Sequence, residues 1–403
     1  MISFLPTYKF HKICFALLMI VTILDPGNTI FKMKELLFIL TFLLGLLEFK
    51  NFLNWYILIS SFSFSLMFPL MWLFFGYVFN FNFSLEYGLM YLKAFVFFLL
   101  INVSLDTRID FSKLFVATTF LLIPITIFLY FFIGEFKSVE VVFLDFKETF
   151  VISKRAFGGY VFDPVIFYKT SPLIIFGLSY LCQINRFKYL IFNAILIILC
   201  LFTLVISGTR ANMMAGVVIL FYFFYKNYFT KNKAFKIFFW LISALCFIVF
   251  LIPFFGTYVF DTYEQSNQAK LNIINDYFYL WSNNIYSIPF GQGLGGGFNT
   301  IERGMSYMVE PTYFEIIRMF GVIGGAVILL FLVLPLFLFS ISKSSNLYTK
   351  YQYLLIAYIL YLLIEIPSNP LLLSSTGMLI MVVVYSTSIK VYLTRHLKKQ
   401  ITS

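Results

Sequence analysis

Residues 115–132 read FVATTFLLIPITIFLYFF, an unbroken apolar stretch without one charged side chain. A hydrocarbon core about 30 Å thick needs roughly 20 such residues to be crossed by a helix. Residues 237–255 form a second run of this kind. Neither run alternates apolar and polar residues, as strands of a membrane β-barrel do. These stretches therefore predict membrane-spanning α-helices.

The rest of the chain follows the same pattern. Of its 403 residues, 61% are hydrophobic and only 12% are charged, and the mean hydropathy is +0.92. These values are far from those of soluble proteins, so we expect one all-α, polytopic membrane domain over residues 1–403. We predict about 12 transmembrane helices, at 10–25, 35–49, 54–76, 87–105, 114–133, 165–182, 187–206, 210–226, 234–255, 312–340, 349–366 and 370–390.

The net charge of +11 indicates how the chain is oriented in the membrane rather than a nucleic-acid-binding surface. Cytoplasmic loops of membrane proteins are enriched in Lys and Arg. With a cytoplasmic N-terminus, and hence a cytoplasmic C-terminus, the inside groups are Lys9, Lys12, Arg108, Lys113, Arg186, Lys188, Lys226, Lys231, Lys233, Lys236, Lys343, Lys350, Lys390, Arg395, Lys398 and Lys399. We therefore expect a multi-pass protein of a cytoplasmic membrane.

The cysteines carry no pattern of a disulfide or metal site. All four lie inside predicted helices without CxxC spacing, which indicates apolar packing residues: Cys14, Cys182, Cys200 and Cys246. The external segments contain no histidine or cysteine and only scattered carboxylates. We therefore expect no metal and no cofactor.

Two external segments, at about 134–164 and 256–311, are much longer than a connection between helices requires. We expect the external face to be the working face. Cations that break the orientation rule lie there, with Arg210 at the external mouth of a helix; those in the two segments are Lys137, Lys147, Lys154, Arg155, Lys270 and Arg303.

Cations on the outer face suggest an anionic ligand, and a lipid-linked phosphate is the natural anion at a membrane surface. An arginine suits it because its guanidinium binds phosphate oxygens in pairs and keeps its charge. The alternative for Arg210 is a helix-end anchor, and for Lys154 and Arg155 a solvated loop charge. Lys93 lies about two turns inside a helix, where a bare charge costs at least ~2.5 kcal/mol. It would face an aqueous cavity, pair with an acid or extend to the membrane surface.

The second external segment is both polar and aromatic between Asp261 and Asn284. Its tyrosine, tryptophan and amide side chains suit sugar rings, and equally suit a helix at the membrane interface. The run Gly291–Gly297 matches GxGxxG, but no βαβ unit surrounds it, so a dinucleotide site is rejected. A turn whose amides approach a ligand is the preferred interpretation, with Gly293 and Gly295 as binding candidates.

Three motifs together resemble a known family. Ser207–Arg210 reads Ser-Gly-Thr-Arg at the start of a helix, residues 289–298 read PFGQGLGGGF, and residues 310–325 read EPTYFEIIRMFGVIGG as the chain re-enters the membrane. With the late external loop, these motifs resemble the O-antigen polymerase and ligase superfamily. The resemblance covers residues 150–340.

The resemblance implies a GT-C-like fold and a metal-independent glycosyltransferase at the outer face of a bacterial cytoplasmic (inner) membrane. Such an enzyme joins undecaprenyl-pyrophosphate-linked oligosaccharides into O-antigen, capsule or another surface polysaccharide of the cell envelope. Its partners would be membrane lipid, a chain-length regulator and a flippase, with no nucleic acid. Arg210 would stabilise the departing pyrophosphate, with Arg303, Arg155, Lys154 and Lys93 as further substrate contacts. Tyr313 and Arg318 would bind substrate from the re-entry segment.

The absence of an external histidine favours a Wzy-type polymerase over a ligase. The ligase branch carries a His-Asn pair where this chain has Glu310 and Pro311, and its only histidines are His11 and His396. Glu310 or Glu315 would then orient or deprotonate the acceptor hydroxyl. The alternative is that they only pair with Arg303 or Arg318, because Glu315 and Arg318 are i,i+3 neighbours.

Two other classes of function stay open. A lipid-linked oligosaccharide flippase or small-solute carrier usually has repeated halves and binding residues at the membrane midplane. Residues 1–200 and 201–403 show no such repeat. The other possibility is a scaffold for polysaccharide assembly without catalysis.

Overall fold

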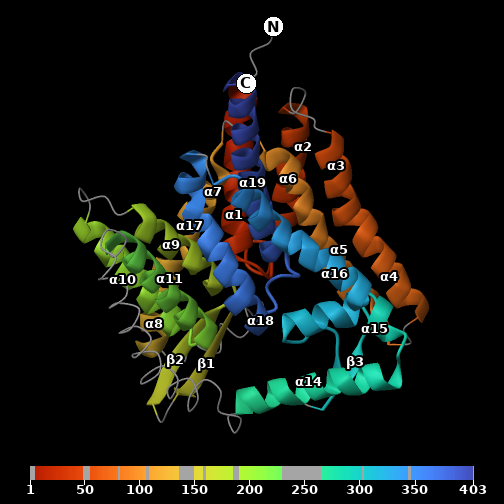
Figure 1. Ribbon diagram of the computed structural model, residues 1–403. Helices are drawn as coiled ribbons and strands as arrows, with labels where there is room; N and C mark the ends of the chain where they lie inside the picture. The colour runs from red at the N-terminus through yellow and green to blue at the C-terminus, as the bar shows by residue number, and fades with distance from the viewer. Residues whose placement is uncertain are drawn as a thin grey trace, which may run out of the picture.

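The computed structural model (Figure 1) is mostly helical. It describes residues 5–48, 55–79, 82–105, 109–135, 149–157, 160–184, 190–228, 265–301, 304–343 and 346–402. Within them, six helical segments are long and apolar enough to cross a membrane: Tyr56–Phe79, Leu85–Ser104, Phe111–Ile133, Thr312–Ile341, Leu347–Glu365 and Ser375–Arg395. Shorter apolar helices are Ser171–Ile184, Ile191–Ile206 and Arg210–Phe223. The chain is thus a helical, polytopic membrane protein.

The first third of the chain folds back and forth in long apolar helices. Their bounds are α1 Leu5–Leu24, α2 Lys34–Glu48, α3 Trp55–Phe62, α4 Phe68–Phe79, α5 Leu85–Val96, α6 Ile101–Ser104, α7 Phe111–Thr119 and α8 Leu122–Glu135. A short π-helical segment at Ser63–Met67 joins α3 to α4, and a short 3-10 helix at Phe97–Leu100 joins α5 to α6. These pairs correspond to the predicted spans 54–76 and 87–105.

The remainder adds two small hairpins and the re-entry region. The elements are β1 Phe150–Phe157, β2 Tyr160–Tyr168, α9 Ile174–Ile184, α10 Leu190–Ile206, α11 Arg210–Tyr228, α14 Gln265–Asn283, α15 Ser287–Phe290, β3 Phe298–Thr300, β4 Gly304–Ser306, α16 Thr312–Ile341, α17 Asn346–Leu360, α18 Ile366–Ser368 and α19 Ser375–Thr402. A π-turn at Tyr361–Glu365 extends α17. The predicted span 234–255 lies outside the described residues.

The two hairpins correct the expectation of a purely helical chain. Strands β1 and β2 pair antiparallel with Phe150 opposite Tyr168, and β3 pairs with β4. The predicted span 165–182 therefore starts too early, because β2 continues to Tyr168 and helical structure begins at Ser171. The β-branched and aromatic side chains of residues 160–168 favour a strand, and length alone could not distinguish this run from a helix.

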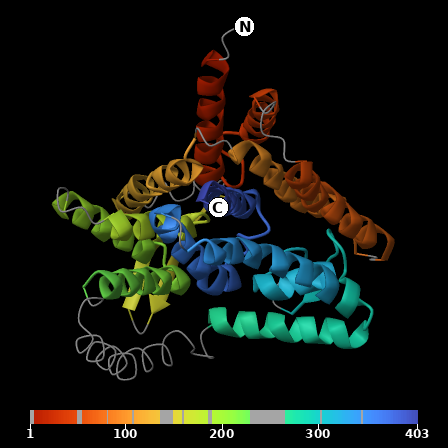
Figure 2. The same ribbon diagram turned by 45° about the horizontal axis from the view of Figure 1, so that its top comes forward.

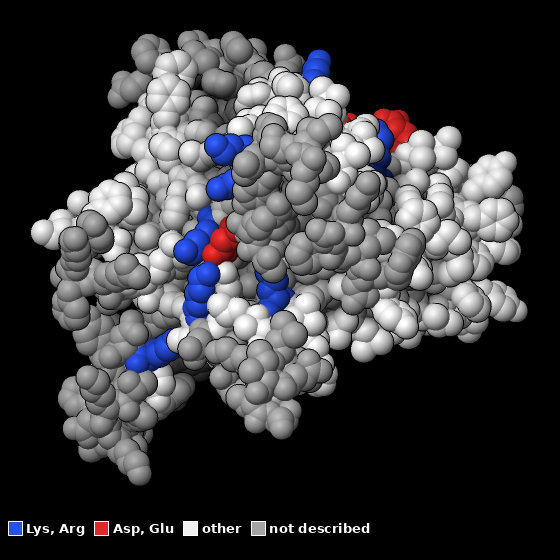
Figure 3. Space-filling view, turned by 90° about the horizontal axis from the view of Figure 1, so that it is seen from above, with Lys and Arg blue, Asp and Glu red and all other residues white. Residues whose placement is uncertain are grey.

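The termini and the hairpins lie at opposite ends of the molecule. Helix α1 begins and α19 ends at one end, whereas β1, β2 and α14 lie at the other (Figure 1). Helix α14 crosses that end instead of running along the bundle, beside α16 (Figures 1 and 2). The end with the termini carries more Lys and Arg than Asp and Glu side chains (Figure 3). The start of α1 and the end of α19 thus share one end of the molecule, and the cytoplasmic location of both termini stays a prediction.

The core is centred on α19. Its Leu379, Val382 and Val384 are fully buried, while α4 and α16 expose Phe79 and Leu330 by 70% and 72%. Such apolar exposure is what a lipid-facing helix requires. The described cysteines, Cys14, Cys182 and Cys200, are buried and free, in accord with the packing role predicted for them.

Candidate functional site

A buried ion pair occupies the first turns of α16. Arg318 is fully buried and Glu315 is 2% exposed. Arg318 Nη2 lies 2.6 Å from Glu315 Oε1, and Arg318 Nε donates to Oε2 at 2.8 Å. The i,i+3 spacing places the two side chains on one helix face. The alternative expectation of an ion pair between these two residues is confirmed.

Every N–H of the Arg318 guanidinium is used within the protein. Besides Glu315, Nη1 donates to Gln292 Oε1 at 2.8 Å and to Gly296 O at 2.5 Å, and Nη2 donates to Tyr307 O at 3.2 Å. The guanidinium also lies 4.8 Å from the ring centroid of Phe298. A guanidinium has five N–H donors, so this conformation offers none to a ligand. In this conformation Arg318 therefore has no free N–H with which to bind a substrate, as was predicted for it.

Helix α14 supplies the other partner of Glu315. The hydroxyl of Tyr277 donates to Glu315 Oε2 at 2.8 Å. Burial raises the pKa of Tyr277, and the negative charge of Glu315 raises it further, so the hydroxyl stays protonated. The Tyr277 ring stacks between neighbours, 5.1 Å from Phe298 and 5.8 Å from Phe314 between centroids. Part of the aromatic segment that was predicted to be external thus builds a core around the ion pair.

The glycine-rich loop is joined to two helices, α16 and α4, by its backbone. The amides of Gln292 and Gly293 donate to Arg318 O and Met319 O, and that of Leu294 donates to Trp72 O, at 2.7–2.9 Å. Gly293 has φ +80°, and a Cβ there would overlap the backbone of Gly76. The expectation that Gly293 presents its amide to a ligand is wrong for this conformation. Gly295, at φ +80°, likewise packs against Ser84 O.

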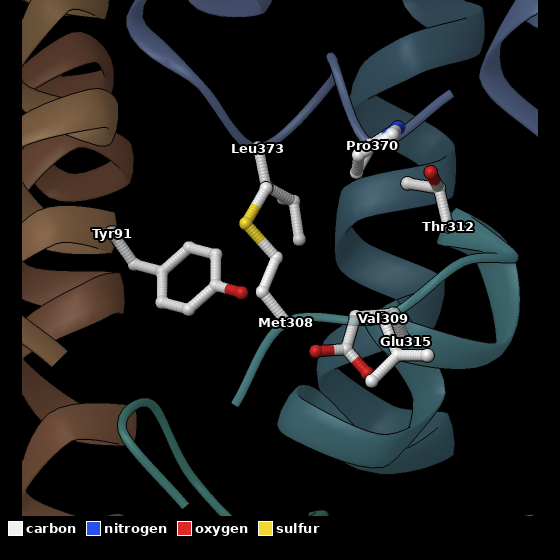
Figure 4. A pocket seen from close by; sticks show the side chains of 7 residues that line it. All are labelled: Tyr91, Met308, Val309, Thr312, Glu315, Pro370 and Leu373. Carbon is white, nitrogen blue, oxygen red and sulfur yellow. The ribbon is translucent and has the colours of Figure 1, made fainter. Parts of the chain in front are cut away.

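A small cavity lies beside the ion pair. Tyr91 of α5, Glu315 and Thr312 of α16, and Leu373 from the loop before α19 face it from different elements, together with Met308, Val309 and Pro370 (Figure 4). Its volume of about 10 Å³ has room for roughly one water molecule. A sugar therefore cannot enter in this conformation, and the cavity marks only where α5, α16 and the residues before α19 meet.

A second buried polar cluster begins next to that cavity. Thr312 Oγ1 donates to Asn369 O at 2.9 Å, and Asn369 Nδ2 donates to Glu365 Oε2 at 3.0 Å. The amide of Asn212 lies within 3.0 Å of both Glu365 oxygens. Ser171, Ser207 and Thr209 surround the other side of that amide, each within 2.8 Å. All of these residues are buried. The cluster joins the starts of α9 and α11 to the end of α17.

Comparisons with known proteins add no assignment: no protein-family model, no curated protein and no solved structure matches the chain. The functional interpretation therefore depends on the residues themselves.

The predicted cations that the structure describes lie on different elements. Arg210 is partly buried and opens α11 directly after the Ser207–Thr209 turn, where Gly208 has φ +62°. Lys154 and Arg155 lie in β1, at a bulge of the hairpin. Lys93 is exposed on α5, so it lies at the surface instead of in a closed cavity. Arg303 lies outside the described residues.

The other predicted residues have structural contacts. Glu310 lies 3.6 Å from Lys270 of α14, both partly exposed, so among the described residues its ion-pair partner is Lys270 instead of Arg318. The hydroxyl of Tyr313 donates to Leu362 O at 2.6 Å and ties α16 to the turn after α17. That hydroxyl can still accept a hydrogen bond.

Sequence reasoning missed the residues of the second cluster. Glu365 lies in residues 361–369, YLLIEIPSN, at the end of a predicted span, where an acidic residue is usually interpreted as part of a helix terminus. Asn212 and Asn369 did not stand out, because asparagine is common in turns. One available indication was overlooked, because an acid inside a predicted span, 349–366, is expensive and marks a functional candidate.

Proposed function

We propose that the protein is a Wzy-type polymerase that joins undecaprenyl-pyrophosphate-linked oligosaccharides at the outer face of a bacterial cytoplasmic membrane. The observation that carries the proposal is a convergence of motifs. The Ser207–Arg210 turn and the re-entry segment at Thr312 meet through Asn212, Glu365 and Asn369, at the end that also bears β1, β2 and α14. Buried polar groups in membrane helices are costly, so they usually serve function.

In the proposed architecture this end is extracytoplasmic and both termini are cytoplasmic. The chain then has twelve spans in a GT-C-like arrangement, with one span over 234–255. Support comes from the shared position of the termini and from the basic residues at their end (Figure 3). The proposed partners are the lipid-linked substrate, a chain-length regulator and a flippase.

Arg210 is the proposed contact to the departing pyrophosphate. It lies in the first turn of α11, where free backbone N–H groups already favour an anion. An acceptor sugar hydroxyl attacks the anomeric carbon of the donor, the bond from that carbon to the pyrophosphate oxygen breaks, and the lipid pyrophosphate leaves with the electron pair. Two positive features then face the charge as it develops.

The proton of the attacking hydroxyl goes to Glu310 in this proposal. Glu310 is partly exposed, so a substrate can reach it. Its ion-pair partner, Lys270, lies 3.6 Å away. Glu315 is less suited, because it is buried and both of its carboxyl oxygens already accept hydrogen bonds from Arg318 and Tyr277.

Arg210→Ala tests the proposal. Loss of a charge-assisted contact made mainly in the transition state should cost roughly 3–4 kcal/mol, or about 10²–10³ in rate. Cells carrying this variant should make single repeat units in place of long chains, while the protein accumulates normally. Arg210→Lys should restore part of the chain length, because it keeps the charge and loses the paired donors.

The same experiment separates the alternatives. A flippase variant would leave no repeat unit outside, whereas a polymerase variant leaves one. Purified protein in lipid nanodiscs should extend the lipid-linked oligosaccharide in excess EDTA. Chains of wild-type length from a normally expressed Arg210→Ala protein would make Arg210 a helix-end anchor and refute the proposal.

A further inference from the structure

Helix α14 runs across one end of the molecule, beside α16, with one of its sides facing inward (Figures 1 and 2). On that side Ile273 and Tyr277 cluster with Phe298 and Val309 in a small core. This core is separate from the large core of the helix bundle. The side chains on the opposite side of α14 are mostly exposed. The protein itself therefore packs against only one side of this helix.

The exposed side of α14 has an apolar edge and a polar edge. Leu271 and Phe278 are 46% and 57% exposed, and because they are seven residues apart, they lie two turns apart on one helix face. Asn283 is also exposed and follows Phe278 by five residues. At about 100° per residue this spacing turns it roughly 140° away from Phe278. Asn275 and Ser282 lie between the two edges.

The exposed side carries no charge within the described residues 268–290. Its exposed residues there are Gln268, Leu271, Asn275, Phe278, Tyr279, Ser282, Asn283, Asn284, Ile285, Tyr286, Ile288 and Phe290. The two charged residues of this range are turned to the protein, since Lys270 pairs with Glu310 and the buried Asp276 accepts from the amide of Ile301. A surface of aliphatic, aromatic and amide side chains suits the zone where lipid headgroups meet acyl chains.

The exposed apolar surface continues from the end of α14 onto a membrane helix. Tyr286, between α14 and α15, and Phe290, at the end of α15, are both exposed. The Phe290 ring centroid lies 6.3 Å from that of Phe75 in α4, and Phe75 lies 5.7 Å from Phe79. Phe79 is exposed on a helical segment long and apolar enough to cross a membrane. Lipid that surrounds α4 therefore also reaches the end of α14.

We propose that α14 is an interfacial helix, which lies on the membrane surface at this end of the molecule with Leu271 and Phe278 toward the acyl chains. Its partner is the lipid bilayer, and binding comes from apolar area, because the exposed side has no charge with which to attract anionic lipid. A glycan is the other ligand that aromatic and amide side chains suit, and the continuity with α4 favours lipid.

Contact between α14 and lipid also has a consequence for the buried ion pair. Tyr277 lies on the inward side of α14 and donates its hydroxyl to Glu315 in the first turn of α16. A helix held at the membrane surface therefore fixes the depth at which α16 begins. This contact requires only a membrane protein and does not rest on the proposed polymerase activity.

Spin labels on single introduced cysteines, measured by electron paramagnetic resonance in lipid nanodiscs, test this contact. The labelled variants are Leu271→Cys and Phe278→Cys. Asn283→Cys is the matched control on the same helix, and Leu330→Cys of α16 is the reference for exposure to lipid. Oxygen concentrates among acyl chains, whereas a nickel chelate stays in water. The ratio of oxygen to nickel accessibility at positions 271 and 278 should exceed that at 283 several-fold and approach that at 330.

Unsubstituted protein that is labelled in parallel gives the background of the native cysteines, and the described ones are buried. Both variants replace exposed side chains, so folded protein is expected, and if one of them does not accumulate, the other decides.

Two results would overturn the assignment of α14 to the membrane surface. One is a nickel accessibility at positions 271 and 278 as high as at 283, which places both edges in water, where a glycan can reach them. The other is protection of positions 271 and 278 from oxygen and nickel alike, which means that protein covers this edge. Loss of polymerisation in Arg210→Ala concerns the proposed enzyme alone and leaves these accessibilities unchanged.

Discussion

Two glutamates at the same end of this molecule are equally buried and differently held. Glu315 accepts from the Arg318 guanidinium and the Tyr277 hydroxyl, whereas Glu365 faces the amides of Asn369 and Asn212. A guanidinium has donors only and keeps its proton, so the first arrangement has one hydrogen-bond pattern. An amide carries both a donor and an acceptor, and one orientation of Asn212 turns its Nδ2 to Glu365 and its Oδ1 to the hydroxyls of Ser171, Ser207 and Thr209. Equal burial is therefore compatible with two kinds of hydrogen-bond partner for an acid, a guanidinium and an amide.

Removing the guanidinium should have the largest effect on stability. Arg318→Leu leaves Glu315 charged and buried, and breaking one partner of such a pair costs about 3–5 kcal/mol. We expect loss of folded protein from the membrane, or a strongly lowered Tm of purified protein. The double variant Arg318→Met with Glu315→Leu should recover most of that loss.

Lys93→Leu is the matched control, because it removes an exposed cation from a membrane helix. Its stability should stay within about 0.5 kcal/mol of the wild type. If Arg318→Leu accumulates and unfolds like Lys93→Leu, the ion pair is not what holds α16 to the glycine-rich loop.

Truncating the amide should have a smaller effect. Asn212→Ala removes one hydrogen-bond partner of Glu365 and one of each of three hydroxyls, which should cost about 1–3 kcal/mol in unfolding free energy. Chemical unfolding in detergent measures it. A loss as large as that of Arg318→Leu would mean that this cluster, too, is a locked structural unit.

The smallest change is expected at the surface pair. Glu310 and Lys270 are partly exposed and 3.6 Å apart, and pairs of this kind contribute about 0–1 kcal/mol. Glu310→Gln should therefore leave Tm nearly unchanged. It should lower the rate of polymerisation, because it removes the proposed general base. A Tm decrease comparable to that of Asn212→Ala would instead show that Glu310 holds α14 in place.

Local patterns in the sequence predicted what local physics determines. Uncharged runs such as residues 115–132 gave helices, and the i,i+3 spacing of Glu315 and Arg318 anticipated their ion pair. The hairpin at residues 150–168 was missed because its second strand is as apolar as a helix. The Glu365 cluster was missed for another reason, since Ser171 and Asn212 come together only when α9, α10 and α11 pack.

The glycines of residues 291–297 show how a motif can be noticed and assigned the wrong cause. The sequence suggested a role in approaching a ligand, whereas Gly293 approaches Gly76 of α4 instead. A Cβ at Gly293 is excluded by the backbone of Gly76, which lies more than 200 residues away along the chain. A local sequence pattern cannot predict a contact between residues so far apart.

That contact across the chain also bears on how the protein is made. Leu294 has no exposed surface, and its N–H and carbonyl lie against Trp72 and Gly76 of α4. The indole of Trp72 likewise donates to Phe290 O, 218 residues further on, at 2.9 Å. During ribosomal synthesis, α4 and α5 enter the bilayer long before residues 290–297 emerge. Until then, lipid or the insertion machinery must cover this surface, so the first helices of the nascent chain cannot reach their final packing until the last third has been translated.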